Sequence, residues 1–290
     1  MFIKMKRITH NAINSFVLAI TAIWFIYRFH NIHSLFTEKT ALSIFTIIGA
    51  AILIHGIKFC RLYLALYDIQ LGLKVCLSTY CKVTPVSIIL PFKMGELYRM
   101  YCYGRQSGIV LRSVVIILLD RFMDTAALVT VITLIWIFDG GRPSALIYFL
   151  LIFLLFSVFS YFIFPGIYQF WQRHLLCAKA SEHKLWALKT LGAMDALYGE
   201  IENVVKGRGV ILYFLSLMAW GIEISSIAFI NHITVMDHAG TVISEYLLSA
   251  MSDRQSPEFN QFVFVSVVGL VLLFVILRIY RVVAEKEDVK

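Results

Sequence analysis

Six long apolar runs limit what this chain can fold into more than any other feature does. Each run has enough residues to cross the ~30 Å hydrocarbon core of a bilayer as a helix, at about 1.5 Å per residue. The sequence is 60% hydrophobic and only 15% charged, which is unlike a soluble domain. We therefore predict an all-α polytopic integral membrane protein with about six transmembrane helices. The runs cover residues 12–29, 41–60, 113–138, 144–167, 209–232 and 262–282.

A seventh apolar run, LGLKVCLSTYCKVTPVSIIL at residues 71–90, differs from the other six. Lys74, Lys82 and Pro85 interrupt this run, and Pro91 follows it. Proline removes a backbone donor and disturbs a helix, so the pattern favours a broken or re-entrant helix over a lipid-facing one. We therefore expect one or two re-entrant helical elements in addition to the spans.

The distribution of basic residues predicts the orientation of the chain, because lysine and arginine are concentrated in the cytoplasmic loops of membrane proteins. Basic residues flank the 71–90 run on both sides, so this run is expected to enter and leave the membrane from the cytoplasmic face. The same rule places both termini and the 168–208 segment in the cytoplasm. The basic residues concerned are Lys4, Lys6, Arg7, Lys58, Arg61, Lys93, Arg99, Arg105, Arg112, Arg173, Lys179, Lys184, Lys189, Lys206, Arg208, Arg278, Arg281, Lys286 and Lys290.

The remaining segments are too short for a separate soluble domain, so a single membrane domain over residues 1–290 is expected. Residues 182–206 carry apolar side chains at helical spacing, which predicts an amphipathic helix on the cytoplasmic surface. Residues 233–261 form an outer loop that is acidic on balance. Its apolar piece from Val242 to Met251 is too short to span, which suggests a second re-entrant element entering from outside.

Charged residues are concentrated in and after the stretch PFKMGELYRMYCYGRQSG, residues 91–108. The apolar run that follows contains Asp120, Arg121 and Asp124. An unpaired ion near the middle of a bilayer costs at least ~2.5–3.5 kcal/mol, so these charges need partners. Arg121 is spaced to reach Asp124 on one helix face, and Arg99 or Lys93 is the expected source of a further cation.

Two interpretations of these charges are compatible with each other. In the first, they form a buried polar knot that holds the re-entrant segment against the third span. In the second, the same cluster and the free cations Lys93, Arg99 and Arg105 line a polar groove open to the cytoplasm, where an anionic headgroup binds. Arginine suits a phosphate because its planar fork can bind two oxygens. The candidate substrate-binding residues in this region are Lys93, Glu96, Arg99, Arg105, Asp120, Arg121 and Asp124.

Glu223 is a further candidate, because it is a lone carboxylate inside the fifth apolar span. It is expected either to pair with a cation from elsewhere in the chain or to be protonated beside the hydroxyls of Ser225 and Ser226. We assign it to the wall of the same cavity.

No pattern in the sequence indicates catalysis, a metal or a cofactor. The five cysteines are odd in number and lack metal-ligand spacing, so neither a disulfide framework nor a zinc site is expected. There is no nucleophile with a nearby base, and no glycine-rich phosphate loop. The net charge of +8 follows from the cytoplasmic bias of the basic residues and gives no reason to expect nucleic acid. We therefore do not expect an enzyme.

The stretch ILPFKMGELYRMYCYGRQSG, followed by a span with LLDRFMDTAAL, resembles the flippase-like transmembrane region of the lysylphosphatidylglycerol synthase family. Members of that family carry a Pro-x-x-x-Gly-Glu-x-x-Arg stretch before a helix with an Arg-x-x-Asp element. The resemblance implies a lipid flippase with two re-entrant elements, here as a stand-alone member without the synthase domain. The matching positions in this chain are Pro91, Gly95, Glu96, Arg99, Arg121 and Asp124.

The second half of the chain departs from the family pattern. The resemblance implies a Pro- and Gly-rich second re-entrant region with a Gly-x-Glu element, whereas this chain has SEYLLSAMSDRQSPEF at residues 244–259. This departure suggests a different substrate or the loss of part of the transport function.

The expected function is translocation, or assistance in translocation, of an anionic phospholipid or lipid-linked saccharide between leaflets of a cell inner (plasma) membrane. A homo-oligomer and a complex with a cell-envelope enzyme are both compatible with the sequence. One alternative is a non-transporting scaffold of a cell-envelope glycosyltransferase or assembly complex. A second is a membrane-embedded lipid transferase that uses the carboxylates of Glu96, Asp120 and Asp124.

Overall fold

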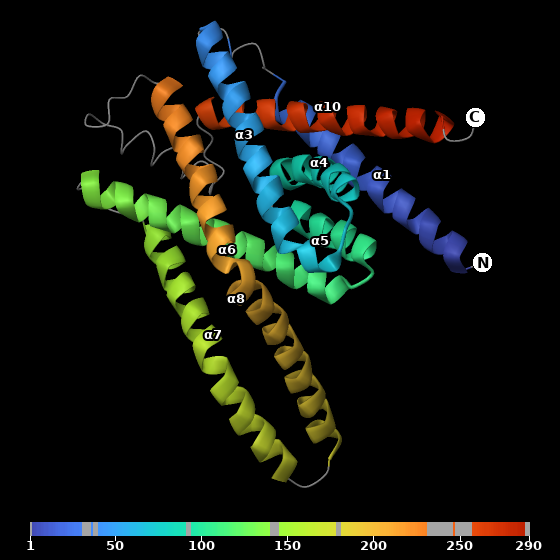
Figure 1. Cartoon of the computed structure of the whole chain (residues 1–290), viewed down its shortest axis with the longest axis vertical. Helices are drawn as coiled ribbons and strands as arrows, with labels where there is room; N and C mark the ends of the chain where they lie inside the picture. Colours follow the sequence, from blue (N-terminus) through green and yellow to red (C-terminus); the bar gives the residue numbers. More distant parts are fainter. Residues whose placement is uncertain are drawn as a thin grey trace.

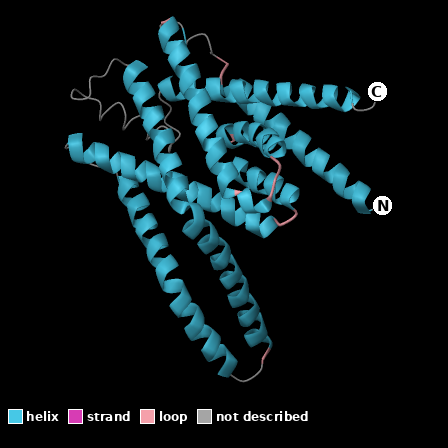
Figure 2. Ribbon diagram, viewed as in Figure 1, coloured by secondary structure: helices cyan, strands magenta, loops and turns pink. Residues whose placement is uncertain are grey.

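Helices make up nearly all of the structure, a computed structural model that describes residues 2–30, 36, 40–90, 94–139, 145–177, 181–230, 246 and 257–287. No strand occurs in these residues (Figure 2). The all-α prediction is therefore confirmed. The elements are α1 (Phe2–Arg28), α3 (Ala41–Ala65), the short 3₁₀ helix η1 (Tyr67–Ile69), α4 (Leu73–Ile89), α5 (Met94–Ser107), α6 (Val110–Asp139), α7 (Ala145–Cys177), α8 (Glu182–Ile230) and α10 (Pro257–Glu287).

Five helices in the described part of the chain are long and apolar enough to cross a membrane: α1, α3, α7, α8 and α10. They correspond to five of the six predicted spans, so the chain is a polytopic membrane protein. The sixth predicted span, residues 113–138, forms the 30-residue helix α6. Its charges at Asp120, Arg121 and Asp124 interrupt the apolar sequence, and it is not among the five. That α6 also crosses the membrane stays a prediction.

The 71–90 run forms the 17-residue helix α4, followed directly along the chain by the 14-residue helix α5. Pro85 lies inside α4 without breaking it, so the expected interruption at this proline is wrong. The helix ends at Ile89, and the next residue, Leu90, has an extended backbone (φ −72°, ψ 131°). A residue before proline avoids the helical region, and Leu90 precedes Pro91, so the local sequence accounts for the break. Entry and return from the cytoplasmic face stay a prediction.

Gly95 allows α4 and α5 to lie in direct contact. A Cβ atom at this position would lie 2.3 Å from Cα of Ser87 and 2.6 Å from the backbone oxygen of Val86. No side chain fits there without moving one helix. The neighbouring Glu96 accepts a hydrogen bond from the Ser87 hydroxyl, which joins the two helices beside this contact.

The α4–α5 pair lies among the longer helices, with α10 and α1 next to α4, and α6 next to α5 (Figure 1). The largest buried hydrophobic cluster joins this pair to α3, α6 and α8, through residues such as Leu62, Tyr103, Ile116 and Leu212. Packing of this kind places α5 between α4 and α6, so that charged side chains of α5 face those of α6.

The predicted surface helix 182–206 is not a separate element, because α8 is one helix of 49 residues that also contains residues 209–230 of the fifth predicted span. Its first half runs beside α7, and both project from the rest of the bundle (Figure 1). Tyr198 stacks on Tyr161 and Phe164 of α7, with ring centroids 5.2 and 4.9 Å apart. The cytoplasmic location of this segment stays a prediction.

Most of the predicted outer loop, residues 233–261, lies outside the described residues, as does nearly all of the second proposed re-entrant piece, Val242 to Met251. Tyr246 is the described exception, and its side chain is buried. The last part of the predicted loop belongs to α10, which begins at Pro257.

We predict that Gly95→Ala lowers stability strongly, because the new methyl group would overlap backbone atoms of α4. Gly56→Ala in α3 is the matched control, since a Cβ there meets no atom within 4 Å. The measurement is the thermal midpoint of the detergent-purified protein by size-exclusion chromatography after heating. Equal midpoints for the two variants would contradict the close packing of α4 on α5.

A second prediction concerns the sidedness of α4 and α5. Tyr67→Cys and Ile109→Cys introduce thiols at exposed positions on either side of the pair, 62% and 52% exposed. The exposed native thiols Cys60 and Cys177 are first replaced by serine. A membrane-impermeant maleimide should label neither site in intact cells and both after permeabilisation. Labelling of only one site from outside would show that α4–α5 crosses the membrane.

Candidate functional site

The candidate site is a cluster of three arginines and three carboxylates where α3, α5 and α6 meet, here called the charge cluster. Each helix contributes at least one member, and Asp120 and Asp124 share one face of α6 because they are four residues apart. The members are Arg61, Glu96, Arg99, Asp120, Arg121 and Asp124.

Arg61 of α3 is the centre of the charge cluster, and its side chain is 1% exposed. Its Nε donates to Oδ1 of Asp120 at 2.7 Å, and its Nη1 donates to Oδ1 of Asp124 at 2.5 Å. The same Nη1 donates to the hydroxyl of Ser216 on α8 at 2.6 Å. Hydrogen bonds between ionised partners are among the strongest in proteins, so Arg61 joins three helices through one side chain.

Sequence reasoning missed Arg61, which it placed among the cytoplasmic residues that close the second span. The sequence feature that could have identified Arg61 as a buried residue is the apolar sequence that continues after it through Leu62, Leu64 and Ala65. This continuation places Arg61 inside helix α3 rather than beyond its end, and a charge inside an apolar helix requires a partner.

Arg99 of α5 is also buried, with 2% of the residue exposed. Its Nη2 donates to Oδ2 of Asp120 at 3.4 Å, and its Nη1 lies 3.6 Å from Oε2 of Glu96. The expectation that Arg99 supplies a cation to the α6 carboxylates agrees with this geometry. The expectation of a free cation at an open mouth does not, because both of its carboxylate partners belong to the protein.

Arg121 lies at the exposed edge of the charge cluster, with a side chain that is 39% exposed. Its Nε is 3.2 Å from Oε2 of Glu96, whereas its distances to Asp124 and Asp120 are 3.9 and 4.0 Å. The expectation that Arg121 reaches Asp124 on one helix face is confirmed at 3.9 Å, but Arg121 is not the closest cation to this carboxylate. Arg61 reaches that carboxylate from another helix at a shorter distance, and the helix spacing on α6 gave no sign of it.

The three positive charges of the arginines in the charge cluster equal the three negative charges of its carboxylates. Removing one member of a buried pair leaves an uncompensated charge, which typically costs ~3–5 kcal/mol, whereas a complete pair can be nearly neutral for stability. The polar-knot interpretation therefore describes Arg61 and Arg99, and the groove interpretation is left with Arg121 as the accessible cation of the cluster.

Glu223 of α8 belongs to a smaller polar group beside Lys58, which lies one turn before Arg61 on α3. Its carboxylate, on a residue 4% exposed, accepts a hydrogen bond from the Tyr246 hydroxyl at 2.6 Å. Lys58 of α3 lies 3.6 Å from the other carboxylate oxygen, so Glu223 has a cation from elsewhere in the chain. The Ser226 hydroxyl donates to the backbone oxygen of Glu223 instead of the carboxylate. Lys58 and Arg61 are three residues apart, which places both polar groups along one face of α3.

The other two predicted residues do not join the charge cluster. Arg105 is exposed near the end of α5, and its Nη1 is 3.5 Å from the Tyr101 hydroxyl. Lys93 lies outside the described residues.

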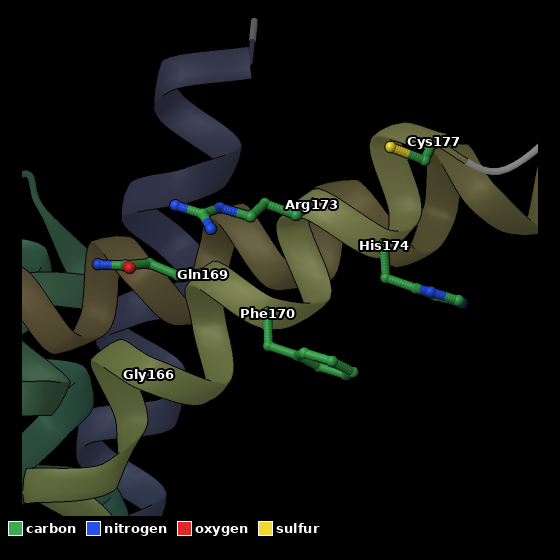
Figure 3. A pocket seen from close by; sticks show the side chains of 6 residues that line it. All are labelled: Gly166, Gln169, Phe170, Arg173, His174 and Cys177. Carbon is green, nitrogen blue, oxygen red and sulfur yellow. The ribbon is translucent and has the colours of Figure 1, made fainter.

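A hollow of about 480 Å³ lies far along α7 from these residues and is not part of the site. Its lining comes from one helix alone, and Figure 3 shows Phe170 and His174 projecting from α7 to one side, with Gln169 and Arg173 pointing elsewhere. Such a surface depression offers no convergent polar groups to a ligand.

We predict that Arg61→Gln destabilises the protein far more than Arg121→Gln does, by about 3–5 kcal/mol, because it leaves Asp120 and Asp124 without their closest cation. Folded yield and thermal midpoint in detergent provide the measurement. Adding Asp120→Asn to Arg61→Gln restores the charge balance and should recover part of the loss. If Arg121→Gln proved as damaging as Arg61→Gln, the central role of Arg61 would be wrong.

A family model of the lysylphosphatidylglycerol synthase TM region matches residues 13–253, a range that includes all of α3 to α8 and every member of the charge cluster. No curated protein and no solved structure gives a significant match to the chain. The matched range is well over half of the 290 residues. The chain therefore belongs to the family of the lysylphosphatidylglycerol synthase TM region.

Proposed function

We propose that this protein translocates, or assists the translocation of, an anionic phospholipid or lipid-linked saccharide between the leaflets of a cell inner (plasma) membrane. The observation that carries the proposal is the position of Arg121, a cation held at the edge of a charge-balanced cluster between α5 and α6, with 39% of its side chain exposed. Membership of the family supports the same function. In this proposal both termini lie in the cytoplasm.

Arg121 is suited to exchange partners, because its contacts are loose. Its nearest carboxylate oxygen, on Glu96, lies 3.2 Å away, compared with 2.7 and 2.5 Å for the two carboxylate contacts of Arg61. A lipid phosphate arriving from the membrane can replace Glu96 at Arg121 and be bound through two oxygens. Glu96 keeps a partner during the exchange, because Ser87 donates to its other oxygen.

The smaller polar group extends the polar surface along α3 and α8. Lys58 is 24% exposed and lies 3.6 Å from Glu223, so a second cation is accessible one turn of α3 away from Arg61. Polar side chains inside a membrane lower the cost of moving a charged headgroup past the hydrocarbon. We therefore assign the headgroup path to the surface that carries the two accessible cations, Arg121 and Lys58.

The competing candidate is a non-transporting scaffold in a cell-envelope complex. It is supported by the burial and complete pairing of Arg61 and Arg99, which would hold the helices in one arrangement. Burial and pairing of Asp120 and Asp124 with Arg61 favour transport over a membrane-embedded transferase that would use these carboxylates.

The test is translocation of acyl-labelled phosphatidylglycerol in liposomes that contain the purified protein, followed by quenching of the outer leaflet. We predict faster movement than in empty vesicles, and a decrease of about tenfold for Arg121→Gln, as expected for the loss of one charge-assisted contact. Arg121→Lys should recover only part of the rate, because an ammonium keeps the charge but not the planar fork.

Lys206→Gln is the matched control, since it removes one exposed positive charge on α8 at a site 72% exposed. It should translocate lipid at the rate of the unchanged protein. A protein that moved no lipid faster than empty vesicles would favour the scaffold instead.

A further inference from the structure

A second cavity, about 170 Å³ in volume, lies between α4 and α5 and is separate from the charge cluster. The cavity lies near the C-terminal end of α5, where its lining residue Arg105 comes six residues after Arg99. The volume is several times the ~30 Å³ that a water molecule occupies in the liquid, so a phosphate group fits. The lining residues are Thr79, Lys82, Cys102, Arg105 and Gln106.

Two cations line this cavity, and its lining among the described residues includes no carboxylate. Neither Lys82 nor Arg105 forms an ion pair with any residue in the described ranges. Arg278 of α10 adds to the positive potential, because it acts electrostatically on Lys82. The cavity therefore differs from the balanced charge cluster: no carboxylate of the described residues pairs with its two cations, so its positive charge attracts an anion.

The polar contacts around the cavity position donors toward it. Nζ of Lys82 donates to Oδ1 of Asn14 on α1 at 2.9 Å and lies 5.5 Å from the ring centroid of Tyr98, which holds the ammonium in place. An ammonium has three donors, so donors remain for a ligand. The Thr79 hydroxyl lies 2.7 Å from Oε1 of Gln106 and 2.8 Å from the backbone oxygen of Val75, and its single proton can serve only one of these acceptors.

The surroundings of the cavity are apolar, which favours a lipid over a soluble anion. Val75, one turn before Thr79 on α4, is 42% exposed, and Ile276 and Ile279 flank Arg278 on α10 with 61% and 58% exposed. Helices α4 and α10 pack against each other, so these side chains belong to one part of the molecule (Figure 1). An acyl chain can lie along them while its headgroup reaches Lys82 and Arg105.

We propose that this cavity binds the phosphate of an anionic phospholipid through Lys82 and Arg105, with the acyl chains against α4 and α10. Its role as a loading site before Arg121 rests on the proposed transport function, whereas binding itself does not. Arg105 supplies the fork that suits two phosphate oxygens, and Lys82 supplies a compact charge from the opposite helix.

Native mass spectrometry of the delipidated protein tests the proposal, using equimolar phosphatidylglycerol and phosphatidylcholine with identical acyl chains. The unchanged protein should retain phosphatidylglycerol preferentially. Lys82→Gln with Arg105→Gln should weaken that retention by about tenfold. The single change Arg105→Gln affects an exposed residue and should also weaken retention while the thermal midpoint stays constant.

Lys189→Gln with Lys206→Gln is the matched control, because it removes the same charge from exposed positions on α8. Equal loss of lipid in the control would show attraction by net charge alone and would overturn the site, as would unchanged retention in the Lys82 and Arg105 variants. Displacement of the lipid by equimolar inorganic phosphate would overturn its assignment to a lipid.

The binding and transport assays can fail separately. Selective phosphatidylglycerol binding without translocation in liposomes would leave this site standing and remove the proposed function. If the protein translocates lipid but its Lys82 and Arg105 variants bind lipid normally, the proposed function stands and this binding site is wrong.

Discussion

The pairing of Arg61 with Asp120 and Asp124 is the interaction on which the arrangement of the other helices depends. It joins α3 to α6, and its contact with Ser216 adds α8. Asp120 in turn holds Arg99 of α5, which packs on α4 at Gly95. A charge inside an apolar bundle is costly without partners, so each of these helices is held in the position that supplies one.

Helix α5 carries two kinds of cation in two different environments. Arg99 lies in a balanced, buried network, and its charge is used within the protein. Arg105, six residues later, lines a cavity with Lys82 and no carboxylate. Arg99 therefore stabilises the fold, whereas Arg105 is available to an external anion. The difference arises because the carboxylate of Asp120 on α6 lies beside Arg99.

The helical class, the spans and most members of the charge cluster were predictable, because apolar run length and the cost of a buried charge are local properties of the sequence. Pairing was less predictable, because Asp124 meets Arg61 from a helix 63 residues earlier while the nearer Arg121 lies further away. Pro85 shows a second limit: tertiary packing keeps α4 helical where backbone chemistry favours a break. The cavity at Lys82 and Arg105 depends on the contact between α4 and α5, which spacing alone does not reveal.

The continuous length of α8 has a mechanical consequence. At 1.5 Å per residue its 49 residues extend over about 74 Å, more than twice the hydrocarbon thickness of a bilayer. If such a helix tilts as a rigid body by ~10° about its middle, each end moves by about 6 Å. Its first half stacks on α7 through Tyr198 and pairs with Arg112 of α6 through Glu200, whereas its second half carries Ser216 and Glu223. If α8 moves as one rigid helix, a displacement of the projecting α7–α8 pair also displaces Ser216 and Glu223, which contact the two polar groups along α3.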